Sequence, residues 1–109
     1  FHCNLMQSAT KKMSEELNKL NFQDTKNKLI SNVSANVISN SNELKELLIQ
    51  QIESRVRWRE SVQKMIKNEV GHFIEIGPGK VLSGLVKRIS RNVKIDTINN
   101  QDDIENLTI

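Results

Sequence analysis

Residues 72–91 read HFIEIGPGKVLSGLVKRISR, and this stretch decides the class of fold. It opens with a short apolar run that stops at a Gly-Pro-Gly turn at 77–79, after which apolar residues recur at helical spacing over 81–89. A second run rich in β-forming residues follows at 93–98. The order of strand, turn, helix and strand predicts one βαβ unit, with parallel strands joined by a right-handed crossover.

The glycine turn with Lys80 beside it raises the question of a phosphate-binding loop, because N–H groups at the start of a helix can bind an anion. The spacing argues against such a loop. A P-loop requires a glycine where this chain has Ile74 and a Ser or Thr where it has Val81, and a dinucleotide loop requires a glycine where it has Leu82. The sequence therefore favours a turn that packs strand against helix. A ligand-binding module that uses the turn remains an alternative.

Three helices are predicted ahead of this unit. The first spans 4–20, with Asn4 as its N-cap and Gln7 completing a capping box. The second covers 41–52 and starts at a Ser-Asn pair, either member of which can serve as its N-cap. The third covers 56–71 and is expected to end at its glycine.

The remaining segments complete an α/β pattern. A short strand is predicted at 29–33, a polar loop at 34–41 and a short final helix at 101–107. Three strands alternating with four or five helices predict at most one domain over residues 1–109, an α/β layered fold with a small parallel sheet flanked by helices. Three strands make an incomplete sheet, so we expect an exposed sheet edge unless something outside the chain pairs with it.

Basic residues gather in one part of the chain. The net charge is +3, and the charged residues between Glu75 and Asp96 are all basic: Lys80, Lys87, Arg88, Arg91 and Lys94. This cluster is either a solvated helix face or a surface that docks an acidic partner or a phosphate-bearing ligand. Nucleic acid is not expected as a partner, because no aromatic side chain interleaves with these charges and the chain has no tyrosine.

Composition also limits the cellular setting. The sequence has no apolar run of about 18 residues and no signal peptide, so we expect a soluble protein of the cytoplasm with no membrane partner. The single cysteine, Cys3, cannot form an internal disulfide, which agrees with a reducing compartment. No Cys/His cluster with zinc spacing and no Asp-rich calcium loop occurs, so no metal is expected.

Two residues outside the βαβ unit are candidates for a site, although both also fit purely structural roles. His2 stands just before a predicted helix, whose positive end disfavours an imidazolium and so favours a ring able to accept a proton. Gln51 lies in the last turn of its helix, where main-chain carbonyls lack helical partners. Because the G-x-S-x-G elbow is absent, these residues supply a possible base and no nucleophile.

Four segments together resemble one family. They are FHCNLM at 1–6, LLIQQI at 47–52 followed by VRW at 56–58, EIGPGKVL at 75–82 and LVKRI at 85–89. In this order and spacing they are similar to the C-terminal third of bacterial malonyl-CoA:acyl carrier protein transacylases, and the similarity covers essentially the whole chain. The resemblance implies the C-terminal part of the large subdomain of that enzyme, with a hydrolase-like core.

The resemblance also implies an activity and roles for five residues. The activity is an acyl transfer of fatty acid biosynthesis, in which malonyl passes from coenzyme A to the phosphopantetheine thiol of acyl carrier protein through a serine ester. No cofactor is implied, because the coenzyme A thioester is a substrate. His2 matches the histidine that activates the serine and later deprotonates the thiol, and Gln51 matches the residue whose main-chain carbonyl orients that histidine. Phe1 matches an aromatic on the substrate side that malonyl-specific members often carry, and Lys87 and Arg88 match basic positions that face the carrier protein.

The chain departs from the family pattern in two ways. Arg55 replaces a proline that is common before the third helix. The serine elbow, the carboxylate-binding arginine, the oxyanion glutamine and most of a ferredoxin-like subdomain lie in the N-terminal part of the family's members, and residues 1–109 contain none of them. We therefore expect an incomplete acyltransferase domain that is inactive until the N-terminal portion is supplied. A non-catalytic remnant or interaction domain of the same fold is the alternative.

Overall fold

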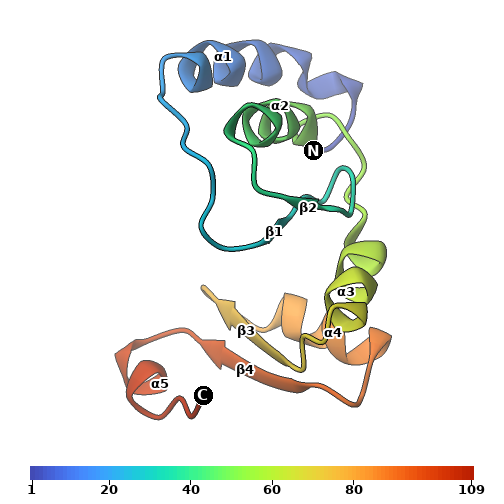
Figure 1. The fold of residues 1–109 in the computed structure, drawn as a ribbon, viewed down its shortest axis with the longest axis vertical. Helices are drawn as coiled ribbons and strands as arrows, with labels where there is room; N and C mark the ends of the chain where they lie inside the picture. The colour runs from blue at the N-terminus through green and yellow to red at the C-terminus, as the bar shows by residue number, and fades with distance from the viewer. The chain divides into compact units, whose positions relative to one another are not determined.

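The computed structural model describes all 109 residues, from Phe1 to Ile109 (Figure 1). Its elements in chain order are the 3₁₀ turn η1 (Asn4–Met6), α1 (Gln7–Asn18), β1 (Leu29–Ile30), β2 (Val37–Ile38), α2 (Ser41–Gln51), α3 (Trp58–Lys67), β3 (His72–Ile76), α4 (Val81–Ile89), β4 (Lys94–Ile98) and α5 (Gln101–Glu105). The fold class is α/β, as predicted. The chain divides into two compact units, residues 1–64 and 65–109.

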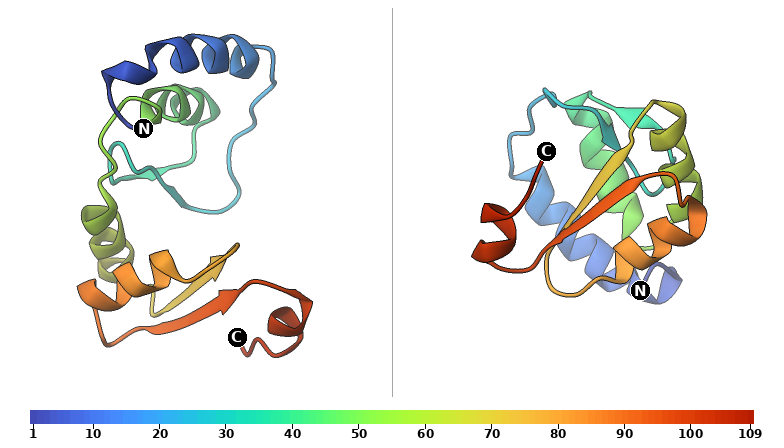
Figure 2. Two further views of the ribbon diagram at one scale, coloured as in Figure 1. Left: turned by 180° about the vertical axis from the view of Figure 1, so that it is seen from behind. Right: turned by 90° about the horizontal axis from the view of Figure 1, so that it is seen from below.

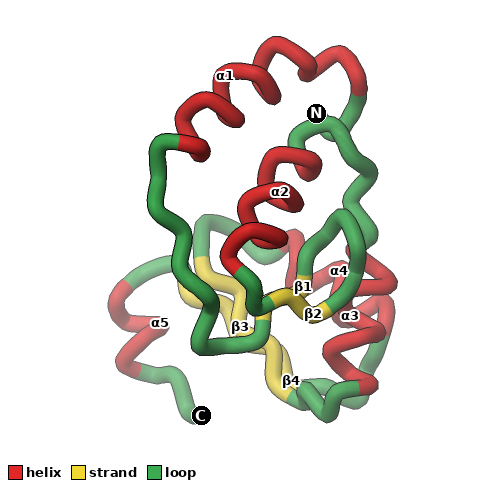
Figure 3. The backbone as a smooth tube through the Cα atoms, turned by 45° about the horizontal axis from the view of Figure 1, so that its top comes forward, coloured by secondary structure: helices red, strands yellow, loops and turns green.

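In the first unit, α1 packs against α2, and the small hairpin of β1 and β2 joins them (Figures 1 and 2). Figure 3 shows the long loop that leads from α1 to the hairpin. The strands are antiparallel, with Leu29 opposite Ile38. The hydrophobic side chains that are buried in this unit are those of Ala35, Ile38 and Val62.

The strand predicted at 29–33 is shorter than expected and belongs to a different sheet. The chain turns directly after β1, where the Ala35 N–H donates to the Ser31 carbonyl at 2.8 Å and Ala35 adopts a left-handed φ of +55°. This turn returns the chain as β2, inside the segment predicted as a polar loop. The hairpin is therefore a separate two-stranded sheet, and the prediction of a third strand in the parallel sheet is wrong.

Helix starts in the first unit also differ from the predicted ones. The capping box at Asn4 and Gln7 is not formed, because the Met6 N–H donates to the Cys3 carbonyl at 3.0 Å in a 3₁₀ turn and the α-helix begins only at Gln7. The N-cap of α2 is Asn40 instead of the Ser-Asn pair that follows it, and its side chain accepts hydrogen bonds from the N–H groups of residues 42 and 43. No helix in the structure has the length and apolarity needed to cross a bilayer.

In the second unit, β3 and β4 run parallel, in register from His72 opposite Lys94 to Ile76 opposite Ile98. Helix α4 connects them and packs on both strands, so the predicted βαβ unit is confirmed, with a parallel sheet of two strands (Figure 1). The turn between β3 and α4 depends on glycine, because φ at 77 is +136° and φ at 79 is +89°, values that L side chains rarely adopt. The final helix, α5, is present and ends two residues earlier than predicted.

Helix α3 ends before Gly71, the residue at which the sequence predicted its end. The left-handed position that usually holds glycine is occupied by Glu69, with a φ of +67°. The N–H groups of Glu69 and Val70 donate to the carbonyls of Ile66 and Met65 at 2.9 and 3.1 Å, which is the Schellman pattern. Main-chain hydrogen bonds therefore determine where α3 ends, although its left-handed position holds Glu69 and not a glycine.

Candidate functional site

His2 is held at the C-terminal end of α2 by two hydrogen bonds. Its ring Nδ1 lies 2.7 Å from the main-chain carbonyl oxygen of Gln51, 49 positions away in sequence, and its backbone N–H donates to the Ile52 carbonyl at 3.0 Å. Carbonyls at the end of an α-helix have no intrahelical partner, so both acceptors are available. The contact between His2 and Gln51 that the resemblance implies is therefore present.

The Gln51 contact fixes the tautomer of the His2 ring. A carbonyl oxygen can only accept a hydrogen bond, so Nδ1 carries the proton and donates it. In the neutral ring Nε2 is then unprotonated, and its lone pair can take a proton from a hydroxyl or a thiol. The arrangement is that of a base oriented by a main-chain carbonyl, in place of the carboxylate of a Ser-His-Asp triad.

An apolar cavity of about 320 Å³ opens beside His2, among residues of α1 and α2. It is lined by Phe1, His2, Met6, Ala9, Met13, Leu48, Gln51 and Ile52. None of these side chains carries a hydroxyl or a thiol, so the cavity offers a base and apolar walls without a nucleophile. Phe1 lies at this cavity with 95% of its surface exposed, so contacts inside this chain do not fix its side chain.

In the second unit, Glu75 of β3 caps the start of α4. Its carboxylate accepts hydrogen bonds from the N–H groups of Leu82 and Ser83 at 3.1 and 2.7 Å and from the Ser83 hydroxyl at 2.6 Å. The Ser83 hydroxyl, followed by the Ser83 N–H, lowers the pKa of the Glu75 carboxyl below its usual value. The Gly79 N–H also has a partner, because it donates to the side-chain oxygen of Asn99 at 2.6 Å. The N–H groups of Gly79, Leu82 and Ser83 are therefore engaged within the chain, which counts against a ligand-binding module at this turn.

The predicted docking residues, Lys87 and Arg88, lie in the last turn of α4, and both are exposed. Cations there interact favourably with the negative end of the helix dipole. Neither residue forms an ion pair. They belong to residues 65–109, whereas His2 and Gln51 belong to residues 1–64, so the structure places the predicted site residues in two separate units.

The second histidine, His72, has no role predicted from the sequence. Its Nε2 lies 2.6 Å from Asp96 Oδ2, and Lys94 Nζ lies 3.5 Å from the same oxygen. The His72 hydrogen bond, assisted by Lys94 and opposed by desolvation, lowers the pKa of Asp96. The pair follows from the strand register, which places His72 opposite Lys94 and two positions from Asp96, so only a correct register could have revealed it. No group of three or more His, Cys, Asp and Glu side chains lies close enough to hold a metal ion.

These features define a class of protein, an α/β segment with a histidine placed to activate a hydroxyl or thiol group. Comparison with known proteins narrows the class, although no protein-family model matches the chain. The chain is 46% identical, over 105 residues, to the malonyl CoA-acyl carrier protein transacylase of Bacillus subtilis strain 168, and the match covers 96% of this chain and 33% of that protein.

Solved structures agree with this relationship. The malonyl-CoA:ACP transacylase of Synechocystis sp. PCC 6803 matches with a TM-score of 0.92 and 34% identity over 98% of this chain and 36% of that one. A malonyl-transacylase in complex with a type II PKS acyl-carrier protein matches with a TM-score of 0.87 and 31% identity over 95% of this chain and 34% of that one. The chain is thus a homologue of the C-terminal part of malonyl CoA-acyl carrier protein transacylases, and it spans about a third of their length.

Proposed function

We propose that this chain is the C-terminal portion of a malonyl-CoA:acyl carrier protein transacylase that serves fatty acid biosynthesis in the cytoplasm. The observation that carries the proposal is the 2.7 Å contact between His2 Nδ1 and the Gln51 carbonyl oxygen, in a chain 46% identical to a transacylase. The contact leaves Nε2 as a proton acceptor beside an apolar cavity. An acyl transfer through a serine ester needs a proton acceptor in each of its two half-reactions.

In the first half-reaction, a serine outside this chain attacks the thioester carbonyl of malonyl-CoA. His2 Nε2 takes the hydroxyl proton as the serine O–C bond forms, and gives it to the coenzyme A sulfur as the C–S bond breaks. In the second half-reaction, Nε2 takes the proton of the carrier thiol as its sulfur attacks the serine ester, and returns it to the serine oxygen that leaves. The Gln51 carbonyl stabilises the ring in the protonated form that arises in each half.

The remaining predicted residues bind substrates in this proposal. Phe1, at the cavity beside His2, contacts the acyl group of the substrate. Lys87 and Arg88 are exposed cations without ion-pair partners, and they contact the acidic surface of the carrier protein. No resident cofactor takes part, because the coenzyme A thioester is itself a substrate.

A chimera tests the proposal, in which this chain replaces the corresponding third of the Bacillus subtilis relative. We expect the chimera to transfer malonyl from coenzyme A to carrier protein, whereas the isolated 109-residue chain has no such activity because it lacks the nucleophile. A chimera that unfolds as cooperatively as the parent enzyme and still transfers no malonyl would contradict the proposal. That result would favour the alternative, a non-catalytic remnant or interaction domain of the same fold.

A further inference from the structure

The last turn of α2 ends in a way that leaves two carbonyls free for His2. The N–H groups of residues 53 and 54 both donate to the Gln50 carbonyl, at 3.2 and 3.0 Å, which closes the last turn of the helix. In a continued helix the next N–H group, that of Arg55, would donate to the Gln51 carbonyl. It forms no main-chain hydrogen bond in this structure. The chain therefore leaves the helix at the point where the acceptor of the His2 ring becomes available.

His2 occupies the positions that the next turn of α2 would take. Its ring Nδ1 lies 2.7 Å from the Gln51 carbonyl oxygen, and its N–H donates to the Ile52 carbonyl at 3.0 Å. In a continued helix, the N–H groups of Arg55 and Val56 would lie about 3 Å from these two oxygens. The next turn and His2 therefore compete for the same two acceptors. An interaction that holds residues 55 and 56 off the helix axis also holds His2 in place.

Arg57 holds this segment on the turn between β1 and β2. Its N–H donates to the Asn32 carbonyl at 2.8 Å, and its guanidinium Nη1 donates to the Ser34 carbonyl at 3.1 Å. The turn has a hydrogen bond of its own, because the carbonyl of the buried Ser31 accepts from the Ala35 N–H at 2.8 Å. Figures 1 and 2 show the chain passing this turn between the end of α2 and the start of α3. The two hydrogen bonds of Arg57 therefore attach the exit of α2 to the hairpin.

The carbonyl of Arg57 is fixed as well. It accepts hydrogen bonds from the Ser61 N–H and hydroxyl at 3.0 and 2.7 Å, and Ser61 is buried. Any residue except proline can supply the N–H and the carbonyl at position 57, so only the guanidinium depends on the residue type. The guanidinium forms no ion pair, and its polar contact is the one with the Ser34 carbonyl. That contact is what an arginine adds at this position.

We propose that Arg57 is a positioning residue for His2. By attaching the chain to the hairpin turn, it prevents α2 from continuing past Ser54 and so keeps the Gln51 and Ile52 carbonyls available to the histidine. Arg57 does not line the cavity beside His2, so it acts through the helix end and not on a substrate. The inference rests on the proposed function for its effect on the rate of malonyl transfer, whereas its effect on the His2 ring does not depend on the reaction.

Replacing the guanidinium tests the proposal in the chimera. Arg57→Met keeps a long side chain but donates no hydrogen bond, so α2 becomes free to continue. With isotope-labelled histidine, the nitrogen NMR signals of the His2 ring are assigned by their loss in His2→Ala. In Arg57→Met they should move from the form protonated at Nδ1 towards a mixture of tautomers. The single-turnover rate of malonyl transfer should fall by roughly threefold to tenfold, the value of one hydrogen bond, while KM for malonyl-CoA stays unchanged.

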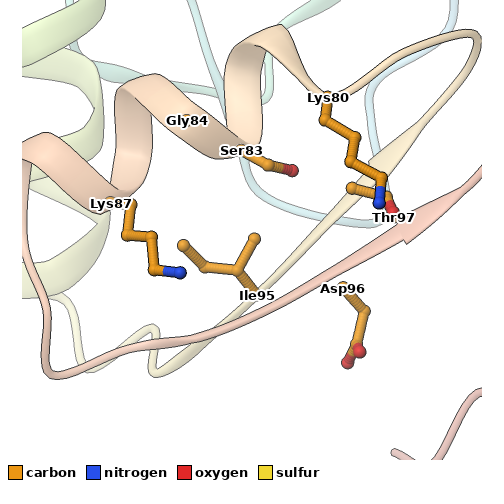
Figure 4. Close-up of a pocket in the computed structure, with 7 residues that line it drawn as sticks. All are labelled: Lys80, Ser83, Gly84, Lys87, Ile95, Asp96 and Thr97. Atoms are coloured by element: carbon orange, nitrogen blue, oxygen red, sulfur yellow. The ribbon is translucent and has the colours of Figure 1, made fainter.

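Three control variants separate the hydrogen bond from the charge. Arg57→Lys can still donate to the Ser34 carbonyl, so it should restore most of the rate and the tautomer. Arg59→Met removes an exposed arginine two positions further on that forms no ion pair, and it should change neither. Lys80→Met removes a cation of the other unit, at the hollow between α4 and β4 that Figure 4 shows, and it should leave the ring tautomer unchanged.

Arg55→Pro provides a suppressor test. Proline has no N–H, so residue 55 can no longer donate to the Gln51 carbonyl, and proline disfavours helical backbone at the residue before it. No main-chain hydrogen bond is lost, because the Arg55 N–H has none. Arg57→Met combined with Arg55→Pro should therefore regain both the ring protonated at Nδ1 and the rate. A loss caused by general weakening of the fold would not be regained, because the proline adds no contact with the hairpin.

Two results would overturn the inference. One is an unchanged ring tautomer in Arg57→Met. The other is a loss of tautomer and rate that Arg55→Pro does not restore, which would assign Arg57 a role in the fold alone. The NMR measurement needs no substrate, so these failures are distinct from failure of the proposed function, which appears as an absence of malonyl transfer in the unsubstituted chimera.

Discussion

His2 has a strained backbone that its hydrogen bonds explain. Its φ of +60° lies in the left-handed region, which costs a residue with a side chain on the order of 1–3 kcal/mol. Two hydrogen bonds to consecutive carbonyls at the end of α2, each with a net value of about 0.5–1.5 kcal/mol, are of the right size to offset that cost. The left-handed turn allows backbone N–H and ring Nδ1 to reach α2 together, and strain of this kind is frequent at functional sites.

Removing the His2 ring is the most direct test of its role. In the chimera, His2→Ala should lower the rate of malonyl transfer by about 10²–10⁴-fold, the usual contribution of a general acid–base group. The fold-reduction in rate caused by Gln51→Ala should be at least about tenfold smaller than that of His2→Ala, because the hydrogen-bond acceptor is the main-chain carbonyl, which the substitution keeps. Single-turnover kinetics with malonyl-CoA separate the chemical step from binding. Near-normal turnover in His2→Ala would refute the assigned role.

Helix α4 owes its position to a residue of the preceding strand. Lys80 at its N-cap makes no side-chain capping bond, and Glu75 serves as the cap from β3. Rules for helix ends consider residues next to the helix, so the sequence did not reveal this cap. The same limit explains the missed end of α3, where main-chain hydrogen bonds place Glu69 in a left-handed position ahead of the predicted glycine. By contrast, the βαβ unit was predictable because a change of hydrophobic period marks both strands and the helix.

The Glu75 cap makes a pH-dependent contribution to stability. Folding lowers the pKa of this carboxyl, so its contribution is present above the pKa of the unfolded state and is lost as the pH falls through the lowered folded value. We expect Glu75→Gln to unfold at a lower urea concentration than the unsubstituted chimera at about pH 7. The difference should shrink towards about pH 3, which lies below the ordinary pKa of a glutamate carboxyl, as the pH approaches the lowered folded-state value.

Glu105→Gln is the matched control for this measurement, because Glu105 ends the exposed helix α5 and does not cap α4. Its unfolding midpoint should follow that of the unsubstituted chimera at both pH values. A Glu75→Gln difference that is the same at both pH values would mean that the lost charge is not the cause.

At the scale of the whole chain, little hydrophobic surface is buried. The buried hydrophobic side chains are those of Ala35, Ile38, Val62 and Val86, and only the last belongs to the second unit. Meanwhile Phe1, Leu5, Ile76 and Val81 are 95%, 91%, 79% and 73% exposed. The sequence indicated an incomplete sheet, and the structure has only pairs of strands. The hairpin partner could not be foreseen, because two-residue strands are too short to show a period.

The small number of buried hydrophobic side chains predicts how the isolated chain behaves in solution. Conformational entropy opposes folding in proportion to chain length, and the few buried side chains in each unit offset little of it. We expect the isolated 109-residue chain to bind a hydrophobic dye such as ANS and to unfold in a broad transition. The chimera should exclude the dye and unfold cooperatively, because we expect the part contributed by the Bacillus subtilis relative to cover the exposed apolar residues. A monomeric isolated chain with a sharp thermal transition and no dye binding would show that the two units are stable without that cover.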